Sequence, residues 1–284
     1  MPNSLEEKRL KKKRQKIKKP MKIGIIGLGV VGKACKFGFE LIGHDVSVHD
    51  TALNTKIEDV RDSEIVFICV PTPSTESGSC DISIVEGVVK ELSEMGYGGL
   101  IAIKSTVEPG TTDLLSIDYN VRVCMVPEFL RERCATTDFT ENHDVCIVGT
   151  WHEEDFKLIK QAHGELPKQF VRLNPKEAEF VKYFNNTYNA TLVTFANSFH
   201  DLCEKEGIDY NTVMNAITQR DHVSKKYLQC NANFRGFGGA CLPKDTRAMA
   251  ALEPGTDITF FSDMLKQNDK FKITVLPGMR VEKE

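Results

Sequence analysis

The sequence lacks the segments that direct a protein into or across a membrane. No apolar run is as long as a membrane span, and no hydrophobic signal-peptide segment is present. The nine cysteines form no C-x-x-C pair and show no Cys/His ligand spacing. An odd, scattered set of this kind argues against both a disulfide framework and a structural zinc site. These absences predict a cytoplasmic protein with no membrane association and no bound metal.

Charge is unevenly distributed, and residues 1–20 carry a strong excess of positive charge. That stretch carries nine Lys or Arg against two Glu, whereas the rest of the chain carries 28 basic and 38 acidic residues. A basic arm can bind nucleic acid or act as a nuclear address. It can also be a disordered leader, which we favour because Met21 directly precedes the first predicted strand. Nucleic-acid binding is therefore not expected, apart from a role of this leader.

Short apolar strands alternate with helical segments over residues 21–173. This alternation predicts an α/β domain with a Rossmann-type, doubly wound parallel sheet, because crossover helices join strands that run in one direction. The predicted strands are Lys22–Ile26, Asp45–His49, Glu64–Val70, Leu100–Ile103, Val121–Val126 and Val145–Gly149, and predicted helices lie near Ser83–Met95 and Thr112–Ile117.

A smaller, all-helical domain is predicted over residues 174–270, followed by a tail at 271–284. Asn174, Pro175 and Glu177 resemble the start of a helix, and the helical pattern then continues to Gly207. A helix of this length can join two domains or form a homodimer interface along residues 175–206. The shorter predicted helices are Tyr210–Thr218, Val223–Gln229, one from Pro243 and one near Ile258–Lys266.

A glycine-rich turn follows the first predicted strand. Residues 27–32 are G-x-G-x-x-G and open the next helix, and Asp50 ends the second strand. In a dinucleotide-binding turn, the glycines admit the pyrophosphate and the carboxylate binds the ribose hydroxyls. A carboxylate repels a 2′-phosphate, so the pattern predicts NAD rather than NADP; the alternative is a glycine turn without a ligand. The predicted cofactor contacts here are Gly27, Gly29, Val30, Val31, Gly32 and Asp50.

Polar segments follow three of the predicted strands, at residues 70–73, 104–112 and 127–132. Ligands of a doubly wound sheet bind beyond the carboxyl ends of its strands, so these segments are expected to meet the nicotinamide and the substrate. The threonines of the second segment can also be helix caps. Glu128 and Glu132 can also be solvated or paired with neighbouring arginines.

The long predicted helix carries Lys182 and Asn186 four residues apart, which places them on one face. Such a pair suits a hydride-transfer site, where one group moves a proton and the other holds a developing oxyanion. A lysine on a helix is also commonly a solvated residue.

The segment at residues 236–245 is GFGGACLPKD. Its glycines allow a tight bend and a close approach of the backbone to a ligand, and Pro243 suits the first turn of a helix. We therefore expect Cys241 just before a helix N-terminus, with Lys244 close by, and both features favour a thiolate. The alternative is a glycine turn with a buried cysteine.

Together these segments resemble the UDP-glucose 6-dehydrogenase/GDP-mannose dehydrogenase family of nucleotide-sugar dehydrogenases. The matching motifs are GIIGLGVVG, VPTP, STVEPGTT, PEFLRE, the Lys182…Asn186 pair and GFGGACLPKD, in family order. The resemblance implies a four-electron oxidation of a sugar C6 alcohol to a carboxylate by NAD, such as UDP-glucose to UDP-glucuronate. It also implies that Cys241 is the nucleophile, because a thiolate makes an aldehyde tetrahedral before it gives up hydride.

The resemblance assigns roles to the remaining motif residues. Those implied for acid–base work, oxyanion stabilisation and water activation, together with the nucleophile, are Cys241, Lys182, Asn186, Asp245, Glu128 and Thr106. Further implied NAD contacts are Thr72, Thr106, Glu132 and Lys244. The implied substrate contacts are Glu128, Phe129, Leu130, Arg131, Glu132, Lys182, Asn186, Arg220, Phe234 and Gly238, of which Arg220 resembles an arginine that this family extends across a dimer.

The sequence departs from the family pattern at two points. A typical member continues into a third domain that closes over the nucleotide, whereas this sequence ends soon after residues 236–245. Asn233-Phe234-Arg235 also replaces the usual proline- and glycine-containing approach to that loop. Two alternatives stay open: a two-electron dehydrogenase of the β-hydroxyacid type, which needs no cysteine, and a shortened NAD-binding protein that requires a partner chain.

Overall fold

A computed structural model describes residues 19–271, 273 and 274. The predicted basic leader lies outside the described residues except for residues 19 and 20. Most of the predicted tail also lies outside them. The chain divides into two compact units, which do not follow the order of the sequence strictly because the short segment Pro73–Cys80 belongs to the second unit.

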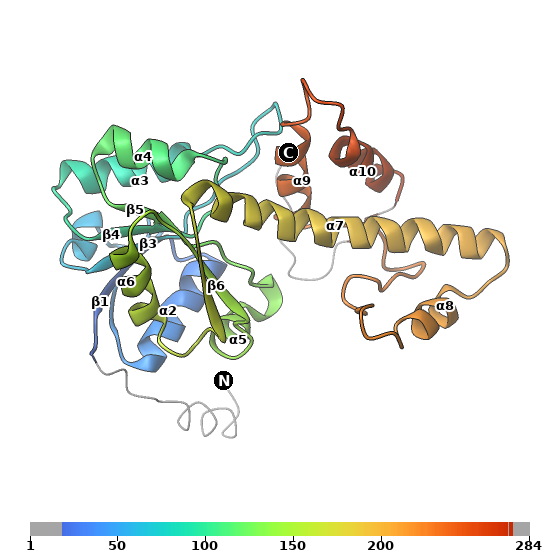
Figure 1. Cartoon of the computed structure of the whole chain (residues 1–284), viewed down its shortest axis with the longest axis horizontal. Coiled ribbons are helices and arrows are strands. Elements are labelled where there is room, and N and C mark those ends of the chain that lie inside the picture. Colours follow the sequence, from blue (N-terminus) through green and yellow to red (C-terminus); the bar gives the residue numbers. More distant parts are fainter. Residues whose placement is uncertain (1–18, 272, 275–284) are drawn as a thin grey trace. The chain divides into compact units, whose positions relative to one another are not determined.

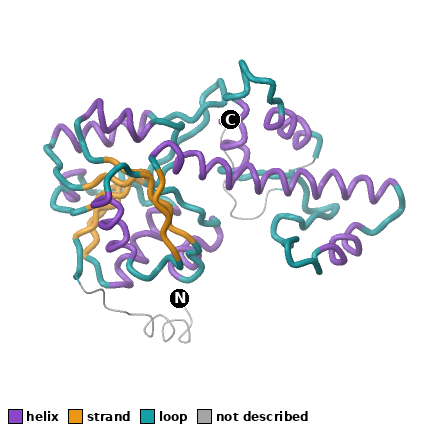
Figure 2. The backbone as a smooth tube through the Cα atoms, in the orientation of Figure 1, coloured by secondary structure: helices purple, strands orange, loops and turns teal. Residues whose placement is uncertain are grey.

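A seven-stranded sheet forms the centre of the first unit, Met1–Thr72 with Asp81–Lys182 (Figures 1 and 2). Its strands are β1 (Lys22–Ile26), β2 (Asp45–His49), β3 (Ile65–Ile68), β4 (Leu100–Ile103), β5 (Val123–Met125), β6 (Val145–Gly149) and β7 (Gln169–Leu173). They are ordered β2-β1-β3-β4-β5-β6-β7, and every neighbouring pair except β5–β6 is parallel. The predicted Rossmann-type sheet is confirmed.

Helices cover both faces of the sheet. They are α2 (Val30–Ile42), α3 (Ser83–Glu94), α4 (Thr111–Tyr119), α5 (Ala135–Thr140) and α6 (Glu153–His163), with short 3-10 turns at Ile57–Val60 and Glu132–Cys134. In β3, Ile65 and Phe67 pack with α2, α5 and α6, whereas Val66 and Ile68 pack with α3 and α4. Successive strand residues point to opposite faces, so a doubly covered strand has to be apolar throughout.

The first unit differs from the sequence prediction in two helices, in one strand and in the direction of one strand pair. The helices α5 and α6 and the edge strand β7 were not predicted; β7 carries only exposed and half-buried residues, so its apolar signal is weak. The sheet is also not wholly parallel, because β5 pairs with β6 in the antiparallel direction at Met125↔Gly149. The connection between two antiparallel neighbours starts and finishes at the same end of the strands. Residues 126–144, which include PEFLRE, therefore begin and end beside the carboxyl ends of the parallel strands β1 to β5.

The second unit, Pro73–Cys80 with Tyr183–Glu284, is helical and confirms the predicted long central helix. The helices are α7 (Pro175–Lys205), which starts in the first unit, and α8 (Tyr210–Ile217), α9 (Leu242–Ala250) and α10 (Phe260–Asp269). At the start of α7, the side chains of Asn174 and Glu177 accept hydrogen bonds from each other's backbone N–H groups, at 2.8 and 3.0 Å. The predicted domain limits at residues 173 and 174 stay a prediction.

The predicted helix over residues 223–229 is wrong. Tyr227 has a φ of 64°, which lies in the left-handed region and interrupts a right-handed helix. As for the membrane, none of the helices in the described part of the chain has the length and apolar character that crossing a bilayer requires.

Two glycines in the first unit offer a matched test of its packing. A Cβ at Gly38 in α2 would lie 2.4 Å from the Phe139 ring of α5, whereas a Cβ at Gly87 in α3 would meet nothing within 4 Å. We expect Gly38→Ala to lower the free energy of unfolding by about 1–3 kcal/mol through overpacking. Gly87→Ala should raise it by about 0.5–1 kcal/mol, because alanine favours the helix. Urea denaturation followed by circular dichroism measures both, and equal effects would contradict this packing.

Candidate active site

The glycine turn between β1 and α2 has the geometry of a dinucleotide-binding loop. Gly27 has a φ of 90°, and a Cβ there would lie 2.7 Å from the backbone oxygen of Cys69. A Cβ at Gly32 would lie 1.9 Å from the oxygen of Gly27, so the helix can approach the turn only because this residue is glycine. Gly29, the N-cap of α2, is different: a Cβ there would meet no atom within 4 Å. Packing does not require glycine at this position, which leaves open space beside the helix N-terminus for a phosphate group.

Asp50 is held against this turn by its carboxylate. Its Oδ2 accepts a hydrogen bond from the Leu28 N–H at 2.6 Å, and its Oδ1 accepts one from the Ala52 N–H at 2.8 Å. The hydrogen bond from Leu28 is the main cause that lowers the pKa of Asp50 below its usual range. The side chain is therefore an anion at the end of β2, where a ribose hydroxyl of NAD would donate to it.

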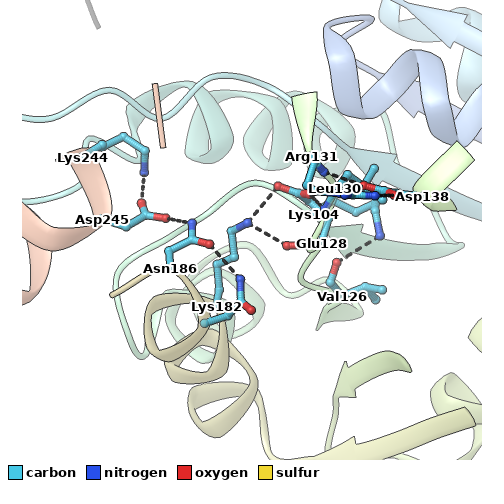
Figure 3. A network of polar contacts seen from close by, with 11 residues as sticks. Lys104, Val126, Glu128, Leu130, Arg131, Asp138, Lys182, Asn186, Lys244 and Asp245 are labelled. Carbon is cyan, nitrogen blue, oxygen red and sulfur yellow. Dashed lines mark hydrogen bonds and ion pairs between the residues drawn. The ribbon is translucent and has the colours of Figure 1, made fainter. Parts of the chain in front are cut away.

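A buried ion pair joins the segment after β5 to the first turns of α7. Lys182 Nζ donates to Glu128 Oε1 at 2.9 Å and to the Glu128 backbone oxygen at 2.7 Å (Figure 3). Burial by itself raises the pKa of Glu128, but attraction to Lys182 and the hydrogen bond from the Leu130 N–H outweigh it, so the pKa lies below its usual range. Buried Lys104, whose Nζ donates to the Val126 oxygen at 3.2 Å, acts in the same direction. Glu128 and Lys182 thus form one charged, nearly dry unit.

The rest of the PEFLRE segment is held by Asp138 of α5. The backbone N–H, Nε and Nη2 of Arg131 donate to Asp138 at 3.0, 2.9 and 2.6 Å (Figure 3). Arg131 was expected to bind substrate, yet its guanidinium already has a bidentate carboxylate partner. Phe129 and Leu130 are half-buried between these two fixed points, and Glu132 starts the short 3-10 turn that follows.

Glu179 of α7 holds the segment after β4. Its carboxylate accepts hydrogen bonds from the Thr112 N–H at 2.8 Å, from the Thr112 hydroxyl at 2.6 Å and from the Gly110 N–H. These donors lie at the N-terminus of α4, whose N-cap is Gly110 and has no side-chain cap hydrogen bond. The threonine cap that the sequence suggested is therefore not formed, and the distant Glu179 accepts from this helix N-terminus instead. Burial raises the pKa of Glu179 despite these bonds. The half-buried Thr106 lies in the segment that this contact holds.

A second set of polar groups lies in the helical unit. Asn186 Nδ2 donates to Asp245 Oδ2 at 2.5 Å, and Lys244 Nζ donates to Asp245 Oδ1 at 2.5 Å (Figure 3). The Asn186 Oδ1 accepts from Asn185 Nδ2 at 2.9 Å, which orients the amide. All three members of the chain Asn186–Asp245–Lys244 are buried. Lys244, predicted as an NAD contact, thus directs its ammonium toward Asp245.

Cys241 is the N-cap residue of α9, and its side chain is exposed. Its carbonyl accepts the hydrogen bond from the Asp245 N–H, at 2.9 Å, that closes the first turn of the helix. Burial lowers the pKa of Lys244, but attraction to Asp245, Cys80 and Cys241 outweighs this and raises it. Cys241 thus lies at the positive end of the helix dipole, with the Lys244 ammonium among the charges that it interacts with.

The remaining predicted residues are more scattered. Arg220 is exposed in the turn after α8, and Phe234 and Gly238 lie in the loop before α9. Thr72 is buried at the end of the first segment of the first unit, just before Pro73–Cys80. Sequence reasoning missed Lys104, Asp138 and Glu179. Each is a buried charged residue. The sequence offered a signal for Lys104, which begins the strand-end segment 104–112, and for Glu179, which precedes Lys182 by one helical turn, but none for Asp138.

The contact between Arg131 and Asp138 predicts an acid-dependent loss of stability. Burial raises the pKa of Asp138, but the side-chain and backbone hydrogen bonds of Arg131 lower it to about 2, from an ordinary value of 3.8. The stabilisation is therefore complete above pH 3.8 and is lost as the pH falls toward 2. We expect Asp138→Asn to lower the free energy of unfolding by about 1–2 kcal/mol at pH 7. Urea titrations of the unmodified chain and of Asp138→Asn at pH 7, 5 and 3 should show a difference in the free energy of unfolding that shrinks only at pH 3. A difference that does not depend on pH would contradict the ion pair.

Comparisons with known proteins show the family of this chain. Residues 49–166 match the model of the UDP-glucose/GDP-mannose dehydrogenase family, NAD binding domain, and residues 176–270 match that of the family's central domain. GDP-mannose 6-dehydrogenase of Pseudomonas aeruginosa is 29% identical over 280 residues, covering 81% of this chain and 63% of its own. UDP-glucose 6-dehydrogenase of Rickettsia typhi is 30% identical over 293 residues, covering 87% and 67%.

A solved structure agrees with these relatives. The UDP-glucose dehydrogenase of the hyperthermophilic archaeon Pyrobaculum islandicum superposes with a TM-score of 0.81 at 27% identity, over 88% of this chain and 68% of that one. The chain thus spans about two thirds of the length of these proteins. We conclude that it belongs to the UDP-glucose/GDP-mannose dehydrogenase family, as its motifs predict, and that it contains the family's NAD binding domain and central domain.

Proposed function

We propose that this chain is an NAD-dependent nucleotide-sugar 6-dehydrogenase, which oxidises a sugar C6 alcohol to a carboxylate, as in UDP-glucose to UDP-glucuronate or a close relative. The observation that carries the proposal is the exposed Cys241 at the N-terminus of α9, next to the buried chain Asn186–Asp245–Lys244. A two-electron alcohol dehydrogenase needs no nucleophile at this position, whereas oxidation of an aldehyde does.

The residues of the first unit fit NAD. The open space beside Gly29 and the positive end of α2 suit the pyrophosphate, and the Asp50 carboxylate suits the ribose hydroxyls. When bound, NAD⁺ accepts hydride, and the complete oxidation consumes two molecules. Thr72, Thr106 and Glu132 are proposed as further contacts.

Cys241 would carry the second oxidation. Its thiolate adds to the C6 aldehyde, forming a carbon–sulfur bond and a tetrahedral alkoxide, which is a thiohemiacetal after protonation. Loss of hydride from that carbon gives a thioester. Water then cleaves the carbon–sulfur bond, which releases the carboxylate and restores the thiol. The polarised position of Cys241 at the helix N-terminus assists both its attack and its departure.

The buried polar groups would handle protons and oxyanions. The Lys182 ammonium, which donates a hydrogen bond to Glu128, can protonate an alkoxide, and the neutral amine that results can accept a proton from an alcohol. The Asn186 amide can hold an oxyanion, and Asp245 can accept a proton from the hydrolytic water. The PEFLRE segment would hold the substrate through its backbone and through Phe129 and Leu130, because Arg131 is engaged by Asp138. Arg220, Phe234, Gly238 and Glu132 complete the proposed substrate contacts.

The first test is the stoichiometry of NADH release. With UDP-glucose, GDP-mannose or a related sugar nucleotide, we expect two NADH for each sugar consumed, and a carboxylate product. Cys241→Ser should lower the turnover rate by about a thousandfold, as loss of a nucleophile does. The control is Cys203→Ala, which removes a buried thiol near the end of α7, in the same unit but outside the proposed site.

Other outcomes would identify the alternatives. One NADH per substrate, insensitive to thiol alkylation, would favour a two-electron dehydrogenase of the β-hydroxyacid type. Thermal stabilisation by NAD but by no sugar nucleotide, with no NADH from any of them, would favour an NAD-binding protein that requires a partner chain. Either result overturns the proposed reaction.

We further propose that the chain forms a homodimer through α7. The helix presents a stripe of exposed apolar side chains, spaced by three, four or seven residues and so gathered on one face. Phe184 is 74% exposed, which is unusual for a large aromatic side chain on a helix unless a partner covers it. The stripe consists of Phe184, Tyr188, Phe195, Phe199 and Leu202.

Placing negative charges on this stripe tests the dimer. Tyr188→Glu combined with Phe195→Glu should convert the dimer into a monomer, because dimerisation would bury both carboxylates without partners. The matched control is Ile117→Glu on α4, a residue that is 75% exposed in the first unit. Sedimentation velocity at micromolar protein concentration measures the oligomeric state. A monomeric unmodified chain, or a dimer that survives the double substitution, would refute the interface.

A further inference from the structure

The loop that carries Cys241 is held at both ends by the core of the helical unit. At its far end, Leu242 starts α9 and packs against the apolar cluster of Ala190, Phe237 and Met264. Phe237, at the near end of the loop, is itself a member of that cluster and is 2% exposed. Only residues 238–240 therefore separate the anchored Phe237 from Cys241.

Asn268 of α10 fixes Phe237 in the manner of a neighbouring strand. The Phe237 N–H donates to Asn268 Oδ1 at 2.8 Å, and Asn268 Nδ2 donates to the Phe237 oxygen at 2.9 Å. Both residues are buried, and the Asn268 amide satisfies both the backbone N–H and the backbone C=O of Phe237. A buried pair of this kind is costly to break, because the N–H and C=O would be left without partners.

The residue before Phe237 is shaped to this contact. Gly236 has a φ of 62°, and a Cβ there would lie 3.1 Å from Asn268 Oδ1, so a side chain would press on the amide. Its N–H donates at 3.0 Å to Oδ1 of Asn197, a buried residue of α7 that also accepts from the Cys230 thiol at 3.3 Å. Two buried amides from two helices thus hold successive residues of the loop.

Arg235 extends the same attachment. Its Nη1 donates to His200 Nδ1 at 2.8 Å, its Nη2 pairs with Asp201, and its guanidinium lies 5.2 Å from the centre of the Phe271 ring. His200 and Asp201 lie close to Glu204 on α7, and their contacts with Arg235 account for this cluster without a bound metal ion. Arg235 is partly exposed, whereas Asn268 is buried, so Asn268 makes the tighter constraint.

We propose that Asn268 is a positioning residue for Cys241: its amide holds Phe237 so that the thiolate meets the substrate carbon. This inference rests on the proposed function, since it concerns the step in which Cys241 attacks the aldehyde. The buried amide is engaged by the Phe237 N–H and C=O, so it would act on Cys241 only through the loop. A displacement of about 1 Å at a reacting atom can cost on the order of a hundredfold in rate.

The two oxidations separate this role from a general loss of stability. Only the oxidation of the aldehyde needs the thiolate, so Asn268→Ala should slow that reaction by on the order of a hundredfold. The first oxidation, and NAD binding at the glycine turn of the other unit, should change by less than about threefold. Asn268→Asp keeps the acceptor for the Phe237 N–H but loses the donor to its oxygen, so it should lie between Asn268→Ala and the unmodified chain.

The experiment measures NADH formation separately from the sugar nucleotide and from its isolated 6-aldehyde, together with the alkylation rate of Cys241 by iodoacetamide, followed by peptide mass spectrometry. Met214→Ala, which truncates a buried side chain of α8 in a separate apolar cluster, is the control for stability. We expect the Asn268 variants alone to change Cys241 alkylation and to slow oxidation of the aldehyde, while the first hydride transfer from the alcohol, measured as the initial burst of NADH, changes little.

Equal loss of both oxidations in Asn268→Ala and Met214→Ala would overturn the proposal, because it would show only a structural role. Unchanged Cys241 alkylation and unchanged aldehyde oxidation in both Asn268 variants would overturn it as well. If the unmodified chain releases no NADH, the proposed function fails on its own. The alkylation comparison then still decides whether Asn268 positions the thiol.

Discussion

The buried ion pair between Glu128 and Lys182 is the interaction on which the arrangement of the strand-end loops depends. Withdrawing two charges from water is costly, and it is repaid only when their geometry is good and their other polar atoms are satisfied. Here Lys182 also reaches the Glu128 backbone oxygen, and the carboxylate accepts from the Leu130 N–H. Removal of either partner would leave the other charge buried and unpaired, so the pair holds the PEFLRE segment at one position on α7.

The helix α7 supplies the same kind of constraint repeatedly along its length. Glu179 caps α4, and Lys182 holds the segment after β5, both within the first unit. Asn186 holds Asp245, and Asn197 holds Gly236, both within the second. In each case a side chain of α7 supplies a hydrogen-bond partner to a polar group of another segment that would otherwise lack one. The candidate catalytic groups are thus positioned by regular structure, including Glu128, which itself lies in a loop.

Much of the fold could be predicted from the sequence, because its signals are local. The apolar run of β3, the turn at residues 27–32 and the N-cap of α7 each depend on neighbouring residues, and the structure confirms them. The edge strand β7 escaped prediction because its residues are exposed or half-buried. The helix expected over residues 223–229 was wrong because the left-handed backbone at Tyr227 interrupts it, which side-chain pattern alone does not reveal.

The sequence by itself determined the chemical types at the candidate site: a cysteine before a helix, an acid at the end of β2, and a lysine and an amide one turn apart. Tertiary structure alone decided their partners. It paired Lys182 with Glu128, engaged Arg131 with Asp138 and placed the Asn268 amide on Phe237, all between residues distant along the chain or on different elements. The physical reason is that a hydrogen bond or ion pair is chosen by burial and distance in space. Residue type and spacing decide only which groups are able to form one.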